Sequence, residues 1–498
     1  MNTRTALSAV FRGMNAILVR VVATYDESKN QPEITIDCPG APKGAAQTIK
    51  NAIDELTDLI EIDDPVPESI TITIKALEDP TSPISGELAS PLRWHDGLCL
   101  PAAVAILKCM GLLPPNCLES TCMIGMFSGK SCEIDYTAGA LSVAEEVARR
   151  QSAGFKMNLL VPGLNVDEAN VFCDDAMEME SLDKLYDVVW KEKGYRDKKG
   201  TYFRYPEIPD FFEISSEKDV ILPSLGQRIL EIAATGNHGL LLVRNKGCNR
   251  ERISDFVQRL HLILPPVSNK ECIEMAKIAS LYYPHDDNPI FYNPLDVRTP
   301  IETYGRLHDP DGPNFPLYHH GLYRLPPFER FKENDFGVVE RVMDERKAPL
   351  RAGESELYPA SLLFVGEIDA SLIEDRTSSP GKWTKIARNL DLHVPLSPCV
   401  PGDDDWSDIW KTRRRVIVAN QILLDVFEQN SKSVEISVDY SRISQNALSA
   451  FDGLSRPFDP TLDSRIYRIA MSIAALEGSD FIKREHFEEA MTYRARPL

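Results

Sequence analysis

Eight residues between two predicted elements have the spacing of a phosphate-binding loop. An apolar strand is predicted at Leu240–Val243, after a helix at Ser224–Ala234, and another helix is predicted after the loop Arg244–Glu251. A strand, an eight-residue loop and a helix are the setting of the P-loop, G-x-x-x-x-G-K-S/T, whose backbone N–H groups hold phosphates and whose hydroxyl holds Mg²⁺. Nucleotide binding is therefore the first chemistry to consider at this loop.

The residues of the loop do not match that chemistry. Arg244 and Asn249 stand where the motif has its two glycines, and their side chains hinder a close approach of the backbone to phosphate. Arg250 replaces the lysine with a planar head that is not equivalent to it, and Glu251 replaces the Ser/Thr with a carboxylate that would repel polyphosphate. Gly247 is the only glycine of the loop. We predict a degenerate cofactor site at these five residues, without bound ATP or Mg²⁺.

Composition is that of a globular protein with sizeable cores. The 498 residues predict about three domains, with 43% hydrophobic and 26% charged residues. The formal net charge of −20 argues against a broad electrostatic grip on DNA or on an anionic membrane. The ten cysteines show no paired C-x-x-C units, Met1–Arg20 lacks the features of a signal peptide, and the longest apolar stretch, Leu98–Leu113, is too short to span a bilayer. We expect a cytoplasmic protein with reduced thiols, no metal and no membrane contact.

Apolar periodicity predicts an α/β first part, an α/β second part and a helical end. In the first part, strands are predicted at Ile17–Val22, Glu33–Ile36, Ser69–Ile74 and Leu159–Pro162, and helices at Ala45–Ile60, Pro101–Cys109, Gly139–Arg150 and Leu182–Trp190. Beyond the loop, the predicted elements are helix Glu251–Leu264, a Pro-rich irregular stretch at Pro284–Pro327, helix Asp335–Arg346, strands Ser361–Val365 and Leu390–Val394, and helices Arg465–Leu476 and Arg484–Tyr493.

The order of these landmarks resembles the magnesium-chelatase-like AAA+ ATPases, specifically their ComM branch. The matching segments are Leu230–His238, Leu260–Ser268, Asp391–Val394, Arg484–His486 and Tyr493–Ala495. The resemblance implies an α/β fold in four parts. These are a Lon-protease-like (ribosomal-S5-like, ChlI-type) domain at 1–193, a linker at 194–219, an AAA+ P-loop-like αβα core at 220–405 and a helical magnesium-chelatase-type lid at 406–498.

The same resemblance locates the Walker B strand, which in the family ends in an acidic pair. Aligned on His320–Leu325, the pair becomes Pro326 and Pro327, which carry no carboxylate. An alternative placement on the strand before Glu367 keeps one acid.

Other nucleotide-handling positions of the family are also replaced. They are Asp369 at the sensor-1 asparagine, Leu295 and Asp296 at the paired histidines, Asn389 at the arginine finger with Arg388 beside it, and Thr461 at the sensor-2 arginine with Arg456 in the preceding loop.

Two further groups of residues could do chemistry. Aligned on a Lon-like Ser/Lys protease, the nucleophile falls near Cys99 and the lysine near Leu141, and His95 could serve as a base for the thiol. The family is not proteolytic here, so we expect Cys99 to be a half-buried residue entering a helix.

A Pro-rich loop also holds adjacent histidines, His319 and His320, with His308 and Asp309 nearby. We expect adjacent histidines not to face one ligand point, and hence no metal site.

Three functional hypotheses follow from these observations. The first is a catalytically silent magnesium-chelatase/ComM-like protein with a structural or regulatory role. The second is an active AAA+ motor of the ComM type acting on branched DNA, and the third is a nucleotide-independent DNA-binding module. Family members form hexameric rings organised by nucleotide, so we predict here a monomer, a small oligomer or a partner of an active AAA+ paralogue in a mixed ring.

Overall fold

The computed structural model divides into two units. The first comprises residues 1–205 and 276–292, and the second 206–275 and 293–498. The structure describes residues 2–25, 33–61, 69–77, 92–129, 131–191, 224–246, 250–282, 301–302, 314–374, 383–396, 409–427, 440–444, 447 and 460–494. The predicted linker at 194–219 lies outside the described residues, and the four-part division stays a prediction.

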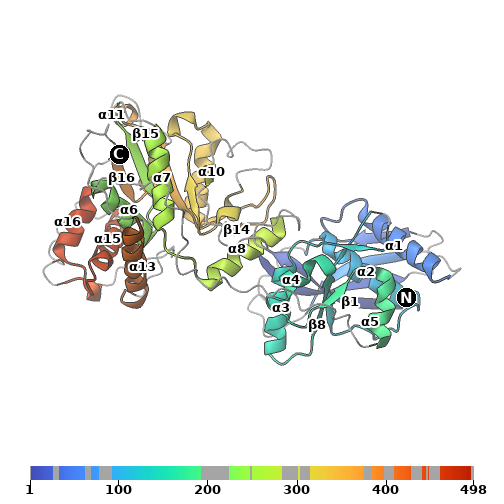
Figure 1. The fold of residues 1–498 in the computed structure, drawn as a ribbon. Coiled ribbons are helices and arrows are strands. Elements are labelled where there is room, and N and C mark those ends of the chain that lie inside the picture. Colours follow the sequence, from blue (N-terminus) through green and yellow to red (C-terminus); the bar gives the residue numbers. More distant parts are fainter. Residues whose placement is uncertain are drawn as a thin grey trace. The chain divides into compact units, whose positions relative to one another are not determined.

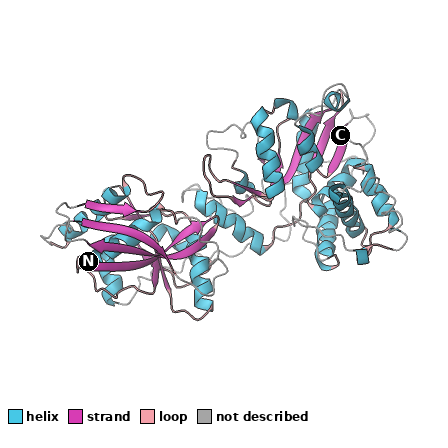
Figure 2. Ribbon diagram, turned by 180° about the vertical axis from the view of Figure 1, so that it is seen from behind, coloured by secondary structure: helices cyan, strands magenta, loops and turns pink. Residues whose placement is uncertain are grey.

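The first unit is built on a mixed seven-stranded sheet (Figures 1 and 2). Its strand order is β3 (Glu33–Asp37), β4 (Ser69–Ala76), β2 (Asn15–Tyr25), β1 (Asn2–Arg12), β5 (Thr121–Met123), β8 (Asn158–Pro162) and β9 (Met177–Met179). Strands β1 and β2 form an antiparallel hairpin, whereas β5, β8 and β9 run parallel to one another. The first part is therefore α/β, as predicted.

Helices cover both faces of this sheet. Because side chains alternate along a strand, Val19 and Val21 of β2 pack with α1 (Ala45–Leu59) and α2 (Cys99–Cys109). Leu18 belongs instead to the core formed with α3 (Ala140–Ser152). Smaller elements complete the unit: β6 (Met126–Phe127), β7 (Ile134–Asp135), α4 (Val166–Ala169) and α5 (Leu185–Lys191).

The second unit contains a five-stranded parallel sheet. Its order is β11 (Ile301–Glu302), β12 (Leu322–Arg324), β15 (Leu363–Asp369), β10 (Leu240–Arg244) and β16 (Leu392–Leu396). One face packs against α6 (Ser224–Gly236) and α7 (Arg250–Ile263), and the other against α10 (Glu333–Glu345) and α12 (Trp383–Asn389). The helices α13 (Ile409–Asp425) and α15 (Pro460–Leu476) pack on α6 and on each other. The helix α16 (Arg484–Thr492) packs with α15. The unit is a three-layer α/β structure.

The helix α8 was not predicted. It spans Asn269–Tyr282, between the predicted helix Glu251–Leu264 and the predicted irregular stretch Pro284–Pro327, and its residues from Ala276 onward belong to the first unit. It begins with a capping box, in which the Ser268 N–H donates to Glu271 Oε2 (2.8 Å) and the Glu271 N–H donates to Ser268 Oγ (3.3 Å). This S-x-x-E signal follows two prolines and could have identified the helix from the sequence.

Among the described residues, none of the helices combines the length and the apolar composition that a membrane crossing requires.

Candidate functional site

The predicted phosphate-binding loop lies where β10 ends, at the carboxyl edge of the parallel sheet. This edge is the usual place for ligands in open α/β sheets. Gly247 and Asn249 lie outside the described residues, and so do the side chains of Arg250 and Glu251, although α7 begins at Arg250. Arg244, the last residue of β10, is therefore the one loop residue among the five whose side chain the structure places.

Arg244 lies among acidic side chains from two other segments. Its Nε is 2.9 Å from Oε1 of Glu367 in β15, an ion pair whose atoms are not aligned for a hydrogen bond. Its Nη2 donates to Oε1 of Glu329 at 3.0 Å and lies 3.8 Å from Oδ2 of Asp369. Arg324 of β12 approaches the other oxygen of Glu367 at 3.5 Å. We call these five residues the Arg244 cluster.

Strand alternation brings the cluster together. Leu322, Leu242 and Val365 face the core that contains α6 and α7, and two residues further along each strand are Arg324, Arg244 and Glu367. The side chains of Glu367 and Arg324 are 1% and 2% exposed, and Arg324 also donates to Ser254 Oγ of α7 at 2.9 Å. The most buried charges at the carboxyl edge are therefore already paired with one another.

Pro326 and Pro327, which stand at the positions expected for the family's acidic pair, also lie at this edge. Leu325 donates its N–H to the carbonyl of Val365 at 2.8 Å, and Pro326 and Pro327 follow directly. The chain then enters a short 3₁₀ turn at Phe328–Arg330, which carries Glu329 to Arg244. Both strands considered for the Walker B position lie in this sheet, and the acid of the alternative placement, Glu367, forms ion pairs with two arginines.

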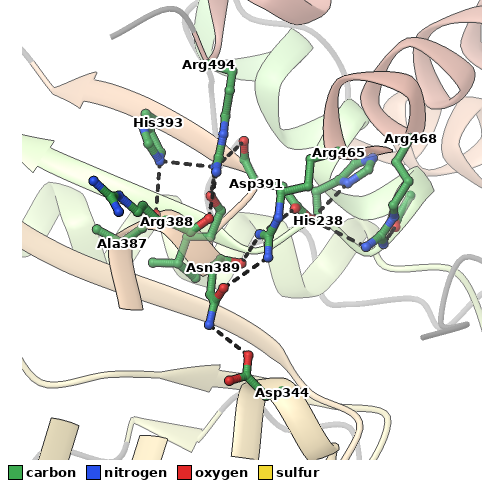
Figure 3. A network of polar contacts seen from close by, with 12 residues as sticks. His238, Asp344, Ala387, Arg388, Asn389, Asp391, His393, Arg465, Arg468 and Arg494 are labelled. Carbon is green, nitrogen blue, oxygen red and sulfur yellow. Dashed lines mark hydrogen bonds and ion pairs between the residues drawn. The ribbon is translucent and has the colours of Figure 1, made fainter. Parts of the chain in front are cut away.

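The position predicted for the arginine finger lies at the opposite, amino-terminal edge. Asn389 precedes β16 and accepts two hydrogen bonds from Arg465 of α15, through its carbonyl O (2.6 Å) and its Oδ1 (3.0 Å). Its Nδ2 donates to Asp344 Oδ1 at 3.0 Å (Figure 3). Thr461 lies in α15, but its side chain is outside the described residues. Leu295, Asp296 and Arg456 lie outside the described residues altogether.

A buried carboxylate organises this amino-terminal edge. Asp391 Oδ2 lies 3.2 Å from His238 Nδ1, and its Oδ1 accepts from Arg465 at 3.2 Å. Arg468 lies 3.8 Å from Asp391 and, with Arg465 and the His238 hydrogen bond, holds the pKa of this carboxyl far below its usual range despite burial. Burial lowers the pKa of His238, which also contacts Ser472 Oγ at 2.9 Å.

Sequence reasoning gave no role to His238 and Asp391, although both belong to segments that carried the family resemblance. Their contact joins the segment before β10, two residues ahead of the strand, to the residue before β16, and the Asp391 N–H also donates to the carbonyl of Gly239 at 2.8 Å. The matching sequence segments Leu230–His238 and Asp391–Val394 thus meet in the fold.

The adjacent histidines do converge, so the prediction that they would not face one point was wrong. The Nε2 atoms of His319 and His320 lie 3.4 and 3.1 Å from Oε2 of Glu274, and the two rings are 3.7 Å apart. The reason is the backbone of His320, whose φ of 62° turns consecutive side chains toward the same side. His308 and Asp309 lie outside the described residues.

Hydrogen bonding nevertheless limits this trio as a metal site. The backbone N–H of Ser361 donates to Nδ1 of His319 at 3.0 Å, so the neutral ring carries its proton on Nε2. That proton points to Glu274, and the hydrogen bond from His319 is the main reason that the pKa of Glu274 falls to about 2. A metal ion would need the Nε2 lone pair that this tautomer lacks.

Cys99 opens α2 and is 3% exposed, more buried than expected. Burial and then the charge of Asp96 raise the pKa of its thiol to about 12, which disfavours the nucleophilic thiolate. His95 Nε2 is 2.8 Å from the carbonyl O of Ala9, and burial lowers the pKa of its ring. These groups have the arrangement of a packed core.

Comparisons with known proteins agree with the resemblance. Residues 217–379 match the family described as magnesium chelatase, subunit ChlI. The chain is 25% identical over 442 residues to the protein YifB of Salmonella typhimurium, which covers 80% of this chain and 81% of that protein. It is 24% identical over 316 residues to competence protein ComM of Haemophilus influenzae, covering 56% of this chain and 59% of ComM. These matches support a magnesium-chelatase-like protein of the ComM branch.

A third relative, the YifB protein of Escherichia coli K12, is 25% identical over 324 residues, which cover 56% of this chain and 60% of that protein. The magnesium-chelatase match contains β10, β12 and β15, and with them the Arg244 cluster. Asp391, Arg465 and Arg468 follow the matched range.

Proposed function

We propose that this magnesium-chelatase-like, ComM-type chain is catalytically silent toward ATP and has a structural or regulatory role. The observation that supports the proposal is the Arg244 cluster. A cation stands at the first glycine position of the loop, and it is ion-paired with a buried carboxylate of the next strand. Arg244, the loop residue whose side chain is described, is thus committed to contacts within the protein.

The described residues do not fit a magnesium–nucleotide complex. Glu367, Glu329 and Asp369 all lie within 4 Å of Arg244, so a triphosphate at this edge would stand beside three carboxylates. Freeing Arg244 for a phosphate would leave Glu367 with one arginine at 3.5 Å, and breaking a buried pair costs about 3–5 kcal/mol. Pro326 and Pro327 offer no carboxylate for Mg²⁺ after β12.

The scaffold around this edge is nevertheless complete, with five parallel strands covered by helices on both faces. A protein that has the α/β scaffold but lacks the residues for phosphate chemistry is suited to a role in binding other proteins. The partner of this proposal is an active AAA+ paralogue in a mixed assembly, and the chain alone is a monomer or a small oligomer. Light scattering of the purified chain would contradict that state if it showed a stable hexamer without nucleotide.

The decisive experiment is titration calorimetry with Mg²⁺–ATP together with a phosphate-release assay on the full chain. We expect no turnover and no binding that depends on the carboxyl edge. The alternative, an active motor, predicts Mg²⁺-dependent turnover that Glu367→Gln abolishes, since Glu367 is its remaining acid. The matched control is Lys385→Gln, an exposed residue (69%) paired with Glu340, which should change nothing. Mg²⁺-dependent turnover by the wild type and by K385Q would overturn the proposal, and its loss in E367Q, assayed below the melting temperature of that variant, would assign the turnover to Glu367.

A further inference from the structure

His320 lies between two carboxylates of α8, one of which faces each nitrogen of its ring. Its Nε2 is 3.1 Å from Oε2 of Glu274, and its Nδ1 is 3.7 Å from Oε1 of Glu271. The side chains of His320, Glu271 and Glu274 are 8%, 15% and 23% exposed, so water screens these contacts only in part. A neutral imidazole carries one proton and would turn a lone pair toward one of the carboxylates, whereas a protonated ring presents an N–H to both.

The neighbouring His319 is not suited to carry the same charge. Its Nδ1 accepts the backbone N–H of Ser361 at 3.0 Å, so a proton on that nitrogen would set two donors against each other. Its ring also lies 3.7 Å from the ring of His320, a distance at which two imidazolium groups repel each other. The histidine pair therefore holds one positive charge, and the flanking carboxylates favour His320 as its carrier.

The charges around His320 decide its protonation against the effect of burial. Burial favours a neutral imidazole and lowers the pKa of His238 and of His393, but arginines act in the same direction on both of those rings. His320 faces carboxylates instead. The pKa of Glu274 falls to about 2, first through the hydrogen bond from His319 and then through the hydrogen bond and charge of His320, so this carboxylate stays ionised at neutral pH.

The two carboxylates also belong to the start of α8. Glu271 and Glu274 are three residues apart and share one face of the helix. The second oxygen of Glu271, Oε2, accepts the Ser268 N–H in the capping box, so one side chain joins His320 to the helix cap. The backbone of His320 is held in turn by its N–H, which donates to the carbonyl of Ser361 at 2.8 Å.

We propose that His320 is a proton-dependent clamp, which holds Glu271 and Glu274 to the segment before β12 and releases one of them when its ring loses a proton. Because both carboxylates favour the charged ring, the folded protein holds this proton more tightly than the unfolded chain, whose histidines titrate near pH ~6.5. The clamp is therefore complete below about pH 6.5 and opens as pH rises above that value.

The clamp acts on a helix that contributes to both units. Residues of α8 up to Met275 belong to the second unit, and those from Ala276 onward belong to the first. The protonation of His320 would thus set how firmly the second unit holds the start of the helix that the two units share. This role is independent of the Arg244 cluster and of nucleotide, so it does not rest on the proposed catalytic silence.

The charge is tested by NMR of the full chain with ¹³C-labelled histidine, titrated from about pH 5.5 to about pH 9. His320 is assigned by the resonance that disappears in His320→Asn, a substitution compatible with its positive φ. We expect a midpoint at least about half a pH unit above that of a free histidine. Glu271→Gln should lower this midpoint by at least about half a pH unit, and glutamine keeps the capping box.

The clamp itself is tested by hydrogen-exchange mass spectrometry of peptides that cover the start of α8. After correction for intrinsic exchange, protection in the wild type should fall at least about fivefold between about pH 6 and pH 8.5, as the proton is lost. H320N should give low protection that does not change over this range. The matched control is His393→Gln, a buried histidine of β16 with a pKa of about 4, which should leave the response of α8 unchanged.

Four results would overturn the proposal. They are a His320 midpoint at or below about pH 6.5, a midpoint that E271Q leaves unchanged, constant protection of α8 in the wild type, and an equal fall of protection in the wild type and H320N. Thermal unfolding at about pH 6 shows whether H320N is folded. If it is not, E271Q serves for both measurements, because it keeps His320 and the cap and should shift the fall in protection to lower pH.

Discussion

Changing Glu367 to glutamine should destabilise the second unit strongly, because its carboxylate lies between two arginines. Removing one partner of a buried ion pair costs about 3–5 kcal/mol. Glu367 and Arg324 are 1% and 2% exposed, so water cannot replace the lost charge, and we expect E367Q to fall in that range. Arg244 is 15% exposed and two of its three carboxylates are partly solvated, so Arg244→Gln should cost less, about 1.5–3 kcal/mol.

The double variant R244Q/E367Q measures directly whether the two side chains are coupled. If Arg244 and Glu367 form one unit, the two costs should not add, and the coupling should be about 1–3 kcal/mol. Differential scanning calorimetry of the full chain measures the shift, on the order of 10 °C for E367Q. Lys385→Gln should leave the transition in place because its ion pair is exposed. Strictly additive effects, or a shift for E367Q no larger than that of K385Q, would refute the reasoning.

Other predictions follow from the described side chains. Burial and Arg494 lower the pKa of His393 to about 4, so the unfolded chain takes up this proton first as pH falls from about 6.5 toward 4. Stability should decline across that window by up to ~3 kcal/mol, and His393→Gln should flatten the decline measured by urea unfolding. The carboxyl of Glu274, with a pKa of about 2, contributes stability above about pH 4.5 that is lost as pH falls toward 2, so Glu274→Gln should lower stability at neutral pH and flatten the decline below about pH 4.5. Cys99, whose pKa is about 12, should resist iodoacetamide at pH 8 until the chain unfolds, as followed by mass spectrometry. Equimolar Zn²⁺ should not raise the melting temperature, and a rise that E274Q removes would contradict the His319 tautomer argued above.

Local periodicity was sufficient to predict most elements of the core. The helix α1 was predicted at Ala45–Ile60 and lies at Ala45–Leu59, because its apolar residues recur at helical spacing and face one core. The strand β10 extends one residue beyond its prediction, to Arg244. The helix α8 was not predicted, although the spacing of Ser268 and Glu271 is that of the capping box at its start.

The site was predictable only in part, because its contacts join residues far apart in the sequence. The loop sequence indicated that a cation, Arg244, stands where the P-loop motif has its first glycine. The partner of that cation, however, depends on which strand lies beside β10. The strand order puts β15 there, and alternation then directs Glu367 to the same face. Similarly, the convergence of His319 and His320 follows from one positive φ, which no residue pattern announces.

The pairing of Arg244 with Glu367 also gives Arg244 a structural role in the loop that we predict to be a degenerate phosphate-binding loop. A carboxylate that is 1% exposed requires a compensating charge, and Arg324 Nη2 lies 3.5 Å from its Oε2. Arg244 supplies the closer contact, at 2.9 Å, from the position of the first P-loop glycine. The arginine is therefore part of the stability of the sheet edge. Replacing Arg244 with glycine would remove the shorter of these two contacts of Glu367. Arg244 and the buried Glu367 are thus one coupled feature of this fold.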